Sequence, residues 1–196
     1  MKCKYEIVED FLPIQWFGQL QKLFLPNSHQ QLYNITAEPQ DTTVSWQYCP
    51  DIITYPDPDS SRTEDEKLQQ WQLVHVFCLA NQFSPWYHHL KPLISAINPI
   101  AIWRIKANLS VQQKTITEGG MHNDGNGKLK YTNMMTSIYY VNSNDGYTKL
   151  EDGTKIESIE NRLVTFNSNI KHTGSTCTDS KVRVVINLNY FKDVNL

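Results

Sequence analysis

The 196-residue sequence has no run of eighteen consecutive apolar residues, no Cys-x-x-Cys pair and no internal repeat. The first absence excludes an apolar membrane-spanning helix. The second argues against a structural zinc site, and the four scattered cysteines favour free thiols in a reducing compartment. The first residues run into Glu9 and Asp10 without an apolar segment, so we expect no secretory signal. A cytoplasmic location is therefore expected, which would be the host cytoplasm if the chain is viral.

The chain also lacks an excess of charge of either sign. It has 18 basic and 20 acidic side chains, a net charge of −2 and a pI near 6.3. The chain therefore has no excess of positive charge to attract an anionic membrane surface, and a nucleic-acid partner is not expected. Hydrophobic residues make up 40% and aromatic residues 11%, enough for a packed core in a chain of 22.8 kDa. We expect one domain over residues 1–196.

Two helices are predicted before residue 100. The first follows Pro13 and ends at Pro26-Asn27-Ser28, and its apolar residues share one helical face: Trp16, Phe17, Leu20, Leu23 and Phe24. The second begins at Ser84-Pro85 and ends at Asn98-Pro99, and Pro92 should kink it or split it in two. His75, His88 and His89, at or near this segment, are expected to be solvated or capped rather than metal ligands.

The second half of the sequence is typical of β-strands. Residues 101–109 alternate apolar and polar side chains, and further strands are predicted over 134–142, 162–166 and 181–190. Asn144-Asp145-Gly146 and Glu151-Asp152-Gly153 are turn signals. Earlier in the chain, 42–48 is predicted as a strand and 50–65 as an exposed loop. This pattern predicts a mainly β (α+β) fold, a β-sandwich or jelly roll with N-terminal helices packed on one sheet. Residues 1–100 would form the helical support and first strands, and 101–196 the core.

Three residues in the β half form a candidate metal site. In an extended segment His122 and Asp124 point the same way, so an imidazole and a carboxylate can reach a common point. His172 follows fifty residues later, a gap that fits a few strands with their turns. Two histidines and one carboxylate on one face of a metal leave about three positions open, which is the arrangement of non-haem Fe(II) oxygenases.

The last predicted strand carries a candidate anion-binding residue. Val182, Val184, Ile186 and Leu188 fall on one face, and the other face carries Arg183, Val185, Asn187 and Asn189. A charge on a half-buried strand is costly unless it is paired. A guanidinium turned inward suits a carboxylate, so a dicarboxylate held by the metal at one end could bind Arg183 at the other.

The order His122-x-Asp124, His172, Arg183 resembles the 2-oxoglutarate/Fe(II)-dependent dioxygenases, and in particular the prolyl-4-hydroxylase-like branch with its small phage-type and bacterial members. The similarity extends through these segments: 102–109, 137–142, 144–148, 151–153, 162–167 and 172–174. Weaker similarity covers the N-terminal helix and the strand of Trp46 and Tyr48, so nearly the whole chain is accounted for. The resemblance implies a double-stranded β-helix fold that uses Fe(II), 2-oxoglutarate and O2, with ascorbate in support. It also implies oxidative decarboxylation to succinate and CO2 coupled to hydroxylation of a C–H bond.

The same resemblance assigns roles to individual residues. His122, Asp124 and His172 match the iron ligands, and Arg183 matches the partner of the distal 2-oxoglutarate carboxylate. Three further side chains match positions near the co-substrate: Tyr140, Asn187 and Asn108. Many prolyl hydroxylases have Gly-Gly before a Thr where this chain has Gly146-Tyr147-Thr148.

The identity of the prime substrate and the oligomeric state do not follow from the sequence. Hydroxylation of a protein or peptide side chain such as proline is the first hypothesis. The second keeps the chemistry and changes the substrate to a free amino acid, a small metabolite or a nucleobase. The third, of a different class, is a non-catalytic jelly-roll binding module.

Overall fold

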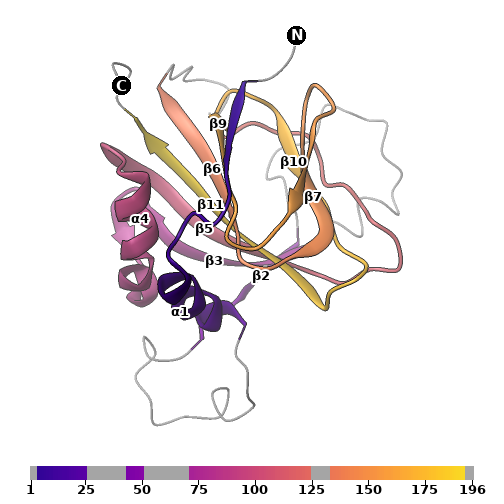
Figure 1. The fold of residues 1–196 in the computed structure, drawn as a ribbon, viewed down its shortest axis with the longest axis horizontal. Coiled ribbons are helices and arrows are strands. Elements are labelled where there is room, and N and C mark those ends of the chain that lie inside the picture. Colours follow the sequence, from indigo (N-terminus) through magenta and orange to yellow (C-terminus); the bar gives the residue numbers. More distant parts are fainter. Residues whose placement is uncertain (1–3, 26–42, 51–70, 125–132, 193–196) are drawn as a thin grey trace.

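Two antiparallel β-sheets and a layer of helices make up the computed structural model, which describes residues 4–25, 43–50, 71–124 and 133–192 (Figure 1). The helices are α1 (Ile14–Phe24), the 3-10 helix η2 (Pro85–Leu90) and α4 (Lys91–Ile97). The strands are β1 (Tyr5–Val8), β2 (Gln47–Cys49), β3 (Gln72–Leu79), β4 (Gln82–Phe83), β5 (Ala101–Val111), β6 (Met134–Tyr140), β7 (Asn144–Leu150), β8 (Lys155–Ser158), β9 (Leu163–Asn167), β10 (His172–Gly174) and β11 (Val182–Phe191).

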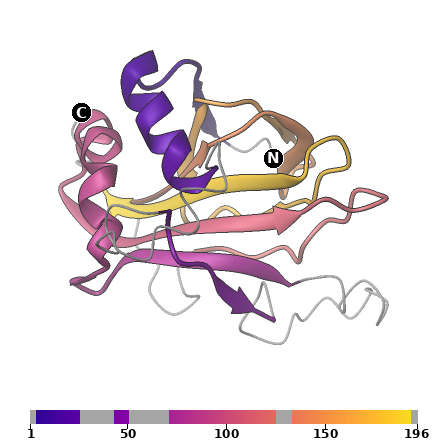
Figure 2. The same cartoon turned by 90° about the horizontal axis from the view of Figure 1, so that it is seen from below.

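The larger sheet has the order β1-β9-β6-β11-β5-β3-β2, with β4 also paired to β3. Its central strand β11 pairs with β6 on one side and β5 on the other, and Figure 2 shows β11, β5, β3 and β2 side by side. The smaller sheet has the order β10-β7-β8. This is the predicted jelly-roll architecture, and strands from both halves of the chain build its larger sheet.

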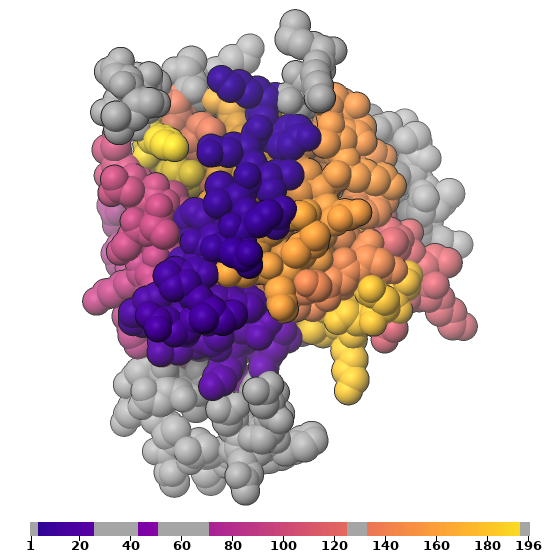
Figure 3. Space-filling model, in the orientation of Figure 1, coloured from indigo at the N-terminus to yellow at the C-terminus, as the bar shows by residue number. Residues whose placement is uncertain are grey.

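The two faces of the larger sheet pack against different layers. Val184, Ile186 and Leu188 of β11 join the core beneath the helices, where Phe17, Leu20 and Leu23 of α1 are also buried. Val185 of β11 points the other way, into a second core between the sheets that contains Tyr140 of β6 and Leu150 of β7. The alternation predicted for this strand is therefore confirmed. Figure 3 shows α1 and β1 lying across one side of the molecule, next to the later strands.

The predicted helices are confirmed, and proline explains their boundaries. Pro13 immediately precedes α1. The second predicted helix is split, because η2 ends at Leu90 and α4 begins at Lys91 with Pro92 in its first turn, where a missing N–H costs no hydrogen bond. Asn98 ends α4 with a left-handed φ of 53°. Among the described residues, none of the helices has the length and apolar character needed to cross a membrane.

Several local predictions were wrong. The strand expected over 42–48 is only Gln47–Cys49, and apart from Pro50 the loop predicted over 50–65 lies outside the described residues. His75 is neither solvated nor a helix cap, because it lies in β3, only 5% exposed, with its two ring nitrogens at hydrogen-bond distance from the Ser45 carbonyl and the Ser84 hydroxyl.

The turn predicted at Asn144-Asp145-Gly146 is also wrong, because these residues begin β7. The chain reverses just before them, where the Asn142 side chain bonds the backbone of Val182 and Val184. The Asp145 carboxylate accepts a hydrogen bond from the Thr178 backbone N–H, so its partner is a distant loop and not its own turn. The second predicted turn, at Glu151-Asp152-Gly153, is confirmed, and Gly153 has a φ of +88°.

Candidate metal centre

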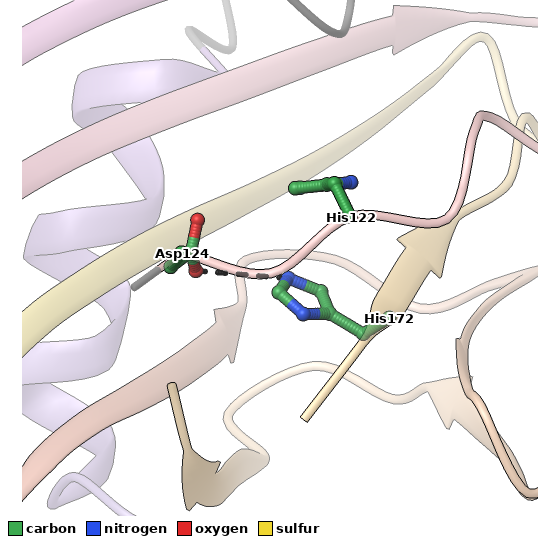
Figure 4. Close-up of side chains that lie close together, drawn as sticks. All are labelled: His122, Asp124 and His172. Carbon is green, nitrogen blue, oxygen red and sulfur yellow. Dashed lines mark ion pairs between the residues drawn. The ribbon is translucent and has the colours of Figure 1, made fainter. Parts of the chain in front are cut away.

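Backbone pairing brings the three predicted ligands together. The segment that carries His122 and Asp124 runs antiparallel to β10, and His122 lies directly opposite His172. Each of these histidines donates its backbone N–H to the carbonyl of the other, at 3.0 and 2.8 Å. One nitrogen or oxygen atom from each of His122, Asp124 and His172 lies within 4.8 Å of the others, and the close-up shows the three side chains gathered beside β10 (Figure 4).

Each of the two imidazoles has one ring nitrogen near a backbone carbonyl. His122 Nδ1 lies 3.0 Å from the Gly120 carbonyl oxygen, and His172 Nδ1 lies 3.3 Å from that of Ile170. A carbonyl can only accept, so each Nδ1 carries the proton and each Nε2 is left as an acceptor. Histidines that bind metals are commonly oriented in this way by a backbone carbonyl.

The Asp124 carboxylate is held by its neighbours on the larger sheet. Its side chain is 3% exposed and Arg104 donates to Oδ1 at 2.7 Å. Thr136 and Asn189 donate to Oδ2 at 3.0 and 2.9 Å, and Asn187 reaches the same oxygen at 3.4 Å. These bonds fix the direction of the carboxylate before any ligand binds.

The electrostatics of the group fit a divalent cation. Burial lowers the pKa of the His172 imidazole to about 4, although the Asp124 charge acts in the opposite direction. Burial alone would raise the pKa of Asp124, but His172, Arg104 and His122 hold it well below its usual range. At neutral pH His172 Nε2 and Asp124 Oδ2, 3.7 Å apart, therefore face each other as two acceptors without a proton between them. A metal ion satisfies both, and two imidazoles with one carboxylate are the donor set of a non-haem Fe(II) site.

Arg183 lies on the same face of β11 as Asn187 and Asn189, as predicted, and is only 4% exposed. Its Nε donates to the Ser158 hydroxyl at 2.8 Å and one terminal nitrogen to the Thr148 hydroxyl at 3.3 Å, both on the smaller sheet. Within the described residues it has no carboxylate partner. A buried guanidinium with two neutral acceptors lacks a counter-charge, and an anionic ligand would supply it.

The surroundings of Arg183 are shaped to hold it. Tyr140 lies with its ring centroid 5.8 Å from the guanidinium carbon and donates its hydroxyl to Thr148 at 2.8 Å. Burial raises the pKa of Tyr140, so it stays protonated and able to donate. A Cβ on Gly146 would lie 2.7 Å from Arg183 Cδ, so this glycine leaves room for the arginine stem. The structure thus places Tyr140 beside Arg183.

The remaining predicted residues, Asn187 and Asn108, lie on the same face of the larger sheet as Arg183, which we call the site face. Asn187 touches Asp124, and Asn108 lies on β5, paired in register with Val185. The Oδ1 atoms of both are buried without a hydrogen-bond partner in the described part of the chain.

The sequence reasoning assigned no role to three residues that hold the site: Arg104, Thr136 and Asn189. For Arg104 and Asn189 a signal existed, because strand alternation places them on the same faces as Lys106 and Asn187. Thr136 lies within a β-prone run in which no pattern distinguishes it.

No protein-family model and no curated protein matches this sequence. Solved structures do match. The non-haem alpha ketoglutarate dependent epimerase SnoN from nogalamycin biosynthesis is similar with a TM-score of 0.61 at 8% identity, over 97% of this chain and 78% of that one. A prolyl hydroxylase from Trichoplax adhaerens, solved with a hypoxia inducible factor peptide fragment, gives 0.56 at 15% identity over 95% and 83%. A Pseudomonas putida prolyl-4-hydroxylase gives 0.50 at 10% identity over 98% and 94%.

The fold of this chain is therefore the double-stranded β-helix that these 2-oxoglutarate/Fe(II) oxygenases share. At such low identities the likeness shows the fold alone, and the chemistry has to be argued from the site.

Proposed function

We propose that this protein is an Fe(II)- and 2-oxoglutarate-dependent dioxygenase that hydroxylates a C–H bond. His122, Asp124 and His172 would hold the metal, and Arg183 would bind the distal carboxylate of 2-oxoglutarate. With Fe(II), 2-oxoglutarate and O2 bound, such a site supplies oxidative decarboxylation to succinate and CO2 coupled to hydroxylation of the substrate.

The observation that carries this proposal is that two groups over one face of the larger sheet are each prepared for a ligand: the His122, Asp124 and His172 cluster and the buried Arg183 guanidinium. At one end the Asp124 carboxylate faces a neutral imidazole nitrogen, and at the other the Arg183 guanidinium is buried without an anion among the described residues. Arg183 and Asn187 are four residues apart, roughly 13 Å along the strand. An elongated acid held by the metal at one end and by the long arginine side chain at the other satisfies both.

The surrounding residues bind and orient the co-substrate. Thr148 accepts from both Tyr140 and Arg183, which leaves its own O–H free to donate to a bound carboxylate. Asn187 would donate its Nδ2 hydrogens toward Asp124 and the metal-bound end. Tyr140 and Arg183 are buried, so water would be excluded from the proposed ion pair between Arg183 and the 2-oxoglutarate carboxylate, which strengthens that pair.

For the prime substrate, the fold supports more than one class. The similar prolyl hydroxylase was solved with a peptide fragment. Another structure of the similar epimerase, with a TM-score of 0.58 at 8% identity over 97% of this chain and 79% of that one, contains Fe3+, alpha ketoglutarate and nogalamycin RO. For this chain we propose a protein or peptide side chain such as proline, or a small molecule, as the substrate. A cytoplasmic location stays a prediction.

The test combines binding with activity. Mn(II) binding in the presence of 2-oxoglutarate is measured by electron paramagnetic resonance, and succinate release is measured with Fe(II), O2 and ascorbate. We expect His122→Ala and His172→Ala to lose both signals, whereas His88→Ala, at an exposed histidine on η2, should match wild type.

Equal Mn(II) binding in wild type and in the two site variants would reject these ligands. Wild-type protein that binds neither Mn(II) nor 2-oxoglutarate would point to the non-catalytic binding module instead.

A further inference from the structure

The half of the site face that lies beyond β11 is built differently from the half that holds Arg183. The apolar core between the sheets takes its residues from β6, β9 and β11 and from the smaller sheet, and within the described residues it takes none from β5, β3 or β2. These three strands continue the larger sheet on the other side of β11 (Figure 2). If 2-oxoglutarate lies over β11 and β6 toward Arg183, a second molecule that approaches the same metal lies over β5.

The residue that β5 presents there is Lys106. Lys106 on β5 pairs in register with Asn187 on β11. It lies two residues from both Arg104 and Asn108 on its own strand, so these four side chains share the site face. Arg104 is occupied with Asp124 and Asn189. Lys106 has no ion pair or hydrogen bond with any residue among 4–25, 43–50, 71–124 and 133–192.

The Lys106 side chain is partly buried, and its ammonium group keeps its charge at neutral pH. Burial and the nearby Arg104 charge lower its pKa to about 8, and Asp124 acts against this shift. It is therefore mostly protonated at pH 7. A desolvated cation without a partner is costly, and a bound carboxylate would remove that cost.

Two hydrogen-bond acceptors next to Lys106 are also unsatisfied. The Oδ1 atoms of Asn108 and Asn187 are buried and lack a donor among the described residues. Side chains directly opposite each other on antiparallel strands have Cβ atoms about 5 Å apart, so Asn187 and Lys106 can contact one small ligand. 2-Oxoglutarate has only acceptors, two carboxylates and a ketone, and cannot satisfy these oxygens. A ligand that combines an anionic group with N–H or O–H donors would satisfy Lys106 and both oxygens.

We infer that the prime substrate is an α-amino acid unit with a free carboxylate, which binds Lys106 while its N–H groups donate to Asn108 and Asn187. This inference rests on the proposed function and narrows its substrate. A free amino acid carries this chemistry in full, and the last residue of a peptide carries the carboxylate with one backbone N–H, enough for one of the two oxygens. An internal residue of a protein does not, because its carboxyl group is an amide.

The experiment uses the full chain loaded with Mn(II) and N-oxalylglycine, an inert mimic of 2-oxoglutarate. The twenty free L-amino acids and their N-acetyl derivatives are titrated by calorimetry, and each one that binds is compared with its carboxamide. We expect at least one acid to bind, and its carboxamide to bind roughly 30-fold or more weakly, the scale for losing one partner of a buried charge pair. Tight binding of the N-acetyl derivative would identify the end of a peptide as the substrate. Weak binding of that derivative would identify a free amino acid.

Variants of Lys106 test the assigned contact. Lys106→Met should lose the same roughly 30-fold for the acid and little for the carboxamide. Lys106→Arg should recover most of the affinity, and Lys22→Met, at an exposed lysine of α1 beneath the other face of the sheet, should change nothing. All three should bind Mn(II) and N-oxalylglycine as wild type does.

If neither an amino acid nor an N-acetyl amino acid binds the loaded protein, or if carboxamides bind as tightly as acids, the inference is rejected while the proposed function stands. Failure of wild-type protein to take up Mn(II) and N-oxalylglycine rejects the proposed function itself. The carboxamide comparison needs only wild-type protein, so it decides the question even if Lys106→Met does not fold.

Discussion

The Asp124 carboxylate shows how single residues prepare this site. Four side chains direct hydrogen atoms at it, and three of them, Arg104, Asn187 and Asn189, come from adjacent strands. Thr136 completes the set from β6. Arg183 is the opposite case, because its hydrogen bonds to the described residues reach neutral hydroxyls, and we propose that its charge binds a ligand. The Asp124 charge thus has hydrogen-bond donors before any ligand binds, whereas the Arg183 charge has no carboxylate partner among the described residues.

Loss of the arginine charge should affect the co-substrate and leave the metal bound. We expect Arg183→Ala to weaken 2-oxoglutarate binding by roughly 2–4 kcal/mol, the scale for breaking a desolvated charge pair. Mn(II) affinity should stay near that of wild type. Calorimetry measures both, with Lys181→Ala as the control because Lys181 is exposed and carries the same charge. Lost Mn(II) binding with unchanged 2-oxoglutarate affinity would contradict the role given to Arg183.

Removal of the Thr136 hydroxyl should affect the metal instead. Thr136→Val keeps the shape of a fully buried side chain and removes one of the donors to Asp124 Oδ2. Losing such a supporting hydrogen bond weakens metal affinity by about 10- to 100-fold. Competition with a fluorescent chelator measures this change. Ser137→Ala removes a buried hydroxyl from the opposite face of β6 and should leave the affinity unchanged, so an equal loss in both variants would refute a specific effect.

At the scale of elements, two close approaches determine where the site residues lie. The antiparallel bridge between His122 and His172 joins a segment of the chain to β10 on the smaller sheet. Gly146 lets β7 approach β11 closely enough for Arg183 to reach Thr148 and Ser158. Neither approach leaves a periodic signal, because both depend on residues far apart in the sequence.

A methyl group at Gly146 should therefore move Arg183. The added Cβ would meet Arg183 Cδ at 2.7 Å and two oxygen atoms at 2.8 Å. We expect Gly146→Ala to destabilise the fold by about 1–3 kcal/mol, as overpacking does, and to weaken 2-oxoglutarate binding. Gly18→Ala is the matched control, since a Cβ in this helical position meets nothing within 4 Å and should stabilise α1 by roughly 0.5–1 kcal/mol. Denaturant unfolding and calorimetry distinguish the two; normal stability and affinity in Gly146→Ala would argue against the assigned packing.

β3 also carries a source of pH dependence that is separate from the site. Burial lowers the pKa of His75 below 6.5, against the effect of the Ser45 hydrogen bond. The unfolded chain therefore binds more protons than the folded one below about pH 6.5, and the free energy of unfolding should fall as the pH drops through this range. Above that pH, His75 contributes no pH dependence.

Urea unfolding at pH 7.5 and 5.5 tests this expectation. His75→Gln should lose less stability than wild type between these two pH values. His88→Gln, at an exposed histidine, should follow wild type. An equal fall in His75→Gln and wild type would show that His75 does not carry the effect.

For the whole molecule, ligand binding should appear as thermal stability. The proposed ligands come from the segment beside β10 and from both sheets, so only the folded chain brings them together. With Mn(II) and N-oxalylglycine at about 100 times their Kd, the folded state gains roughly 2.7 kcal/mol. For a chain of this size that gain raises Tm by roughly 5–10 °C. Differential scanning calorimetry should show the rise in wild type, its reversal by a chelator and its absence in His172→Ala; a rise that persists in the variant would place the metal elsewhere.

Much of this protein could be read from local patterns. Apolar periodicity and proline placed α1, η2 and α4, and strand alternation placed Arg183, Asn187 and Asn189 on one face of β11. The order of His122, Asp124 and His172 was sufficient to predict the cluster of two imidazoles and one carboxylate that the structure assembles. Such features depend on a side chain's position along its own strand or helix, which the sequence states directly.

Long-range contacts decided the rest. Asn144-Asp145-Gly146 has the composition of a turn, but distant loop residues take up its hydrogen bonds and it becomes the start of β7. Thr136 became a support of Asp124 and His75 became a buried residue only through strands that pair across the sheet. Only the structure shows that Lys106 has no charged partner among the residues it describes, because the partners of a side chain depend on its surroundings and cannot be seen in the order of residues.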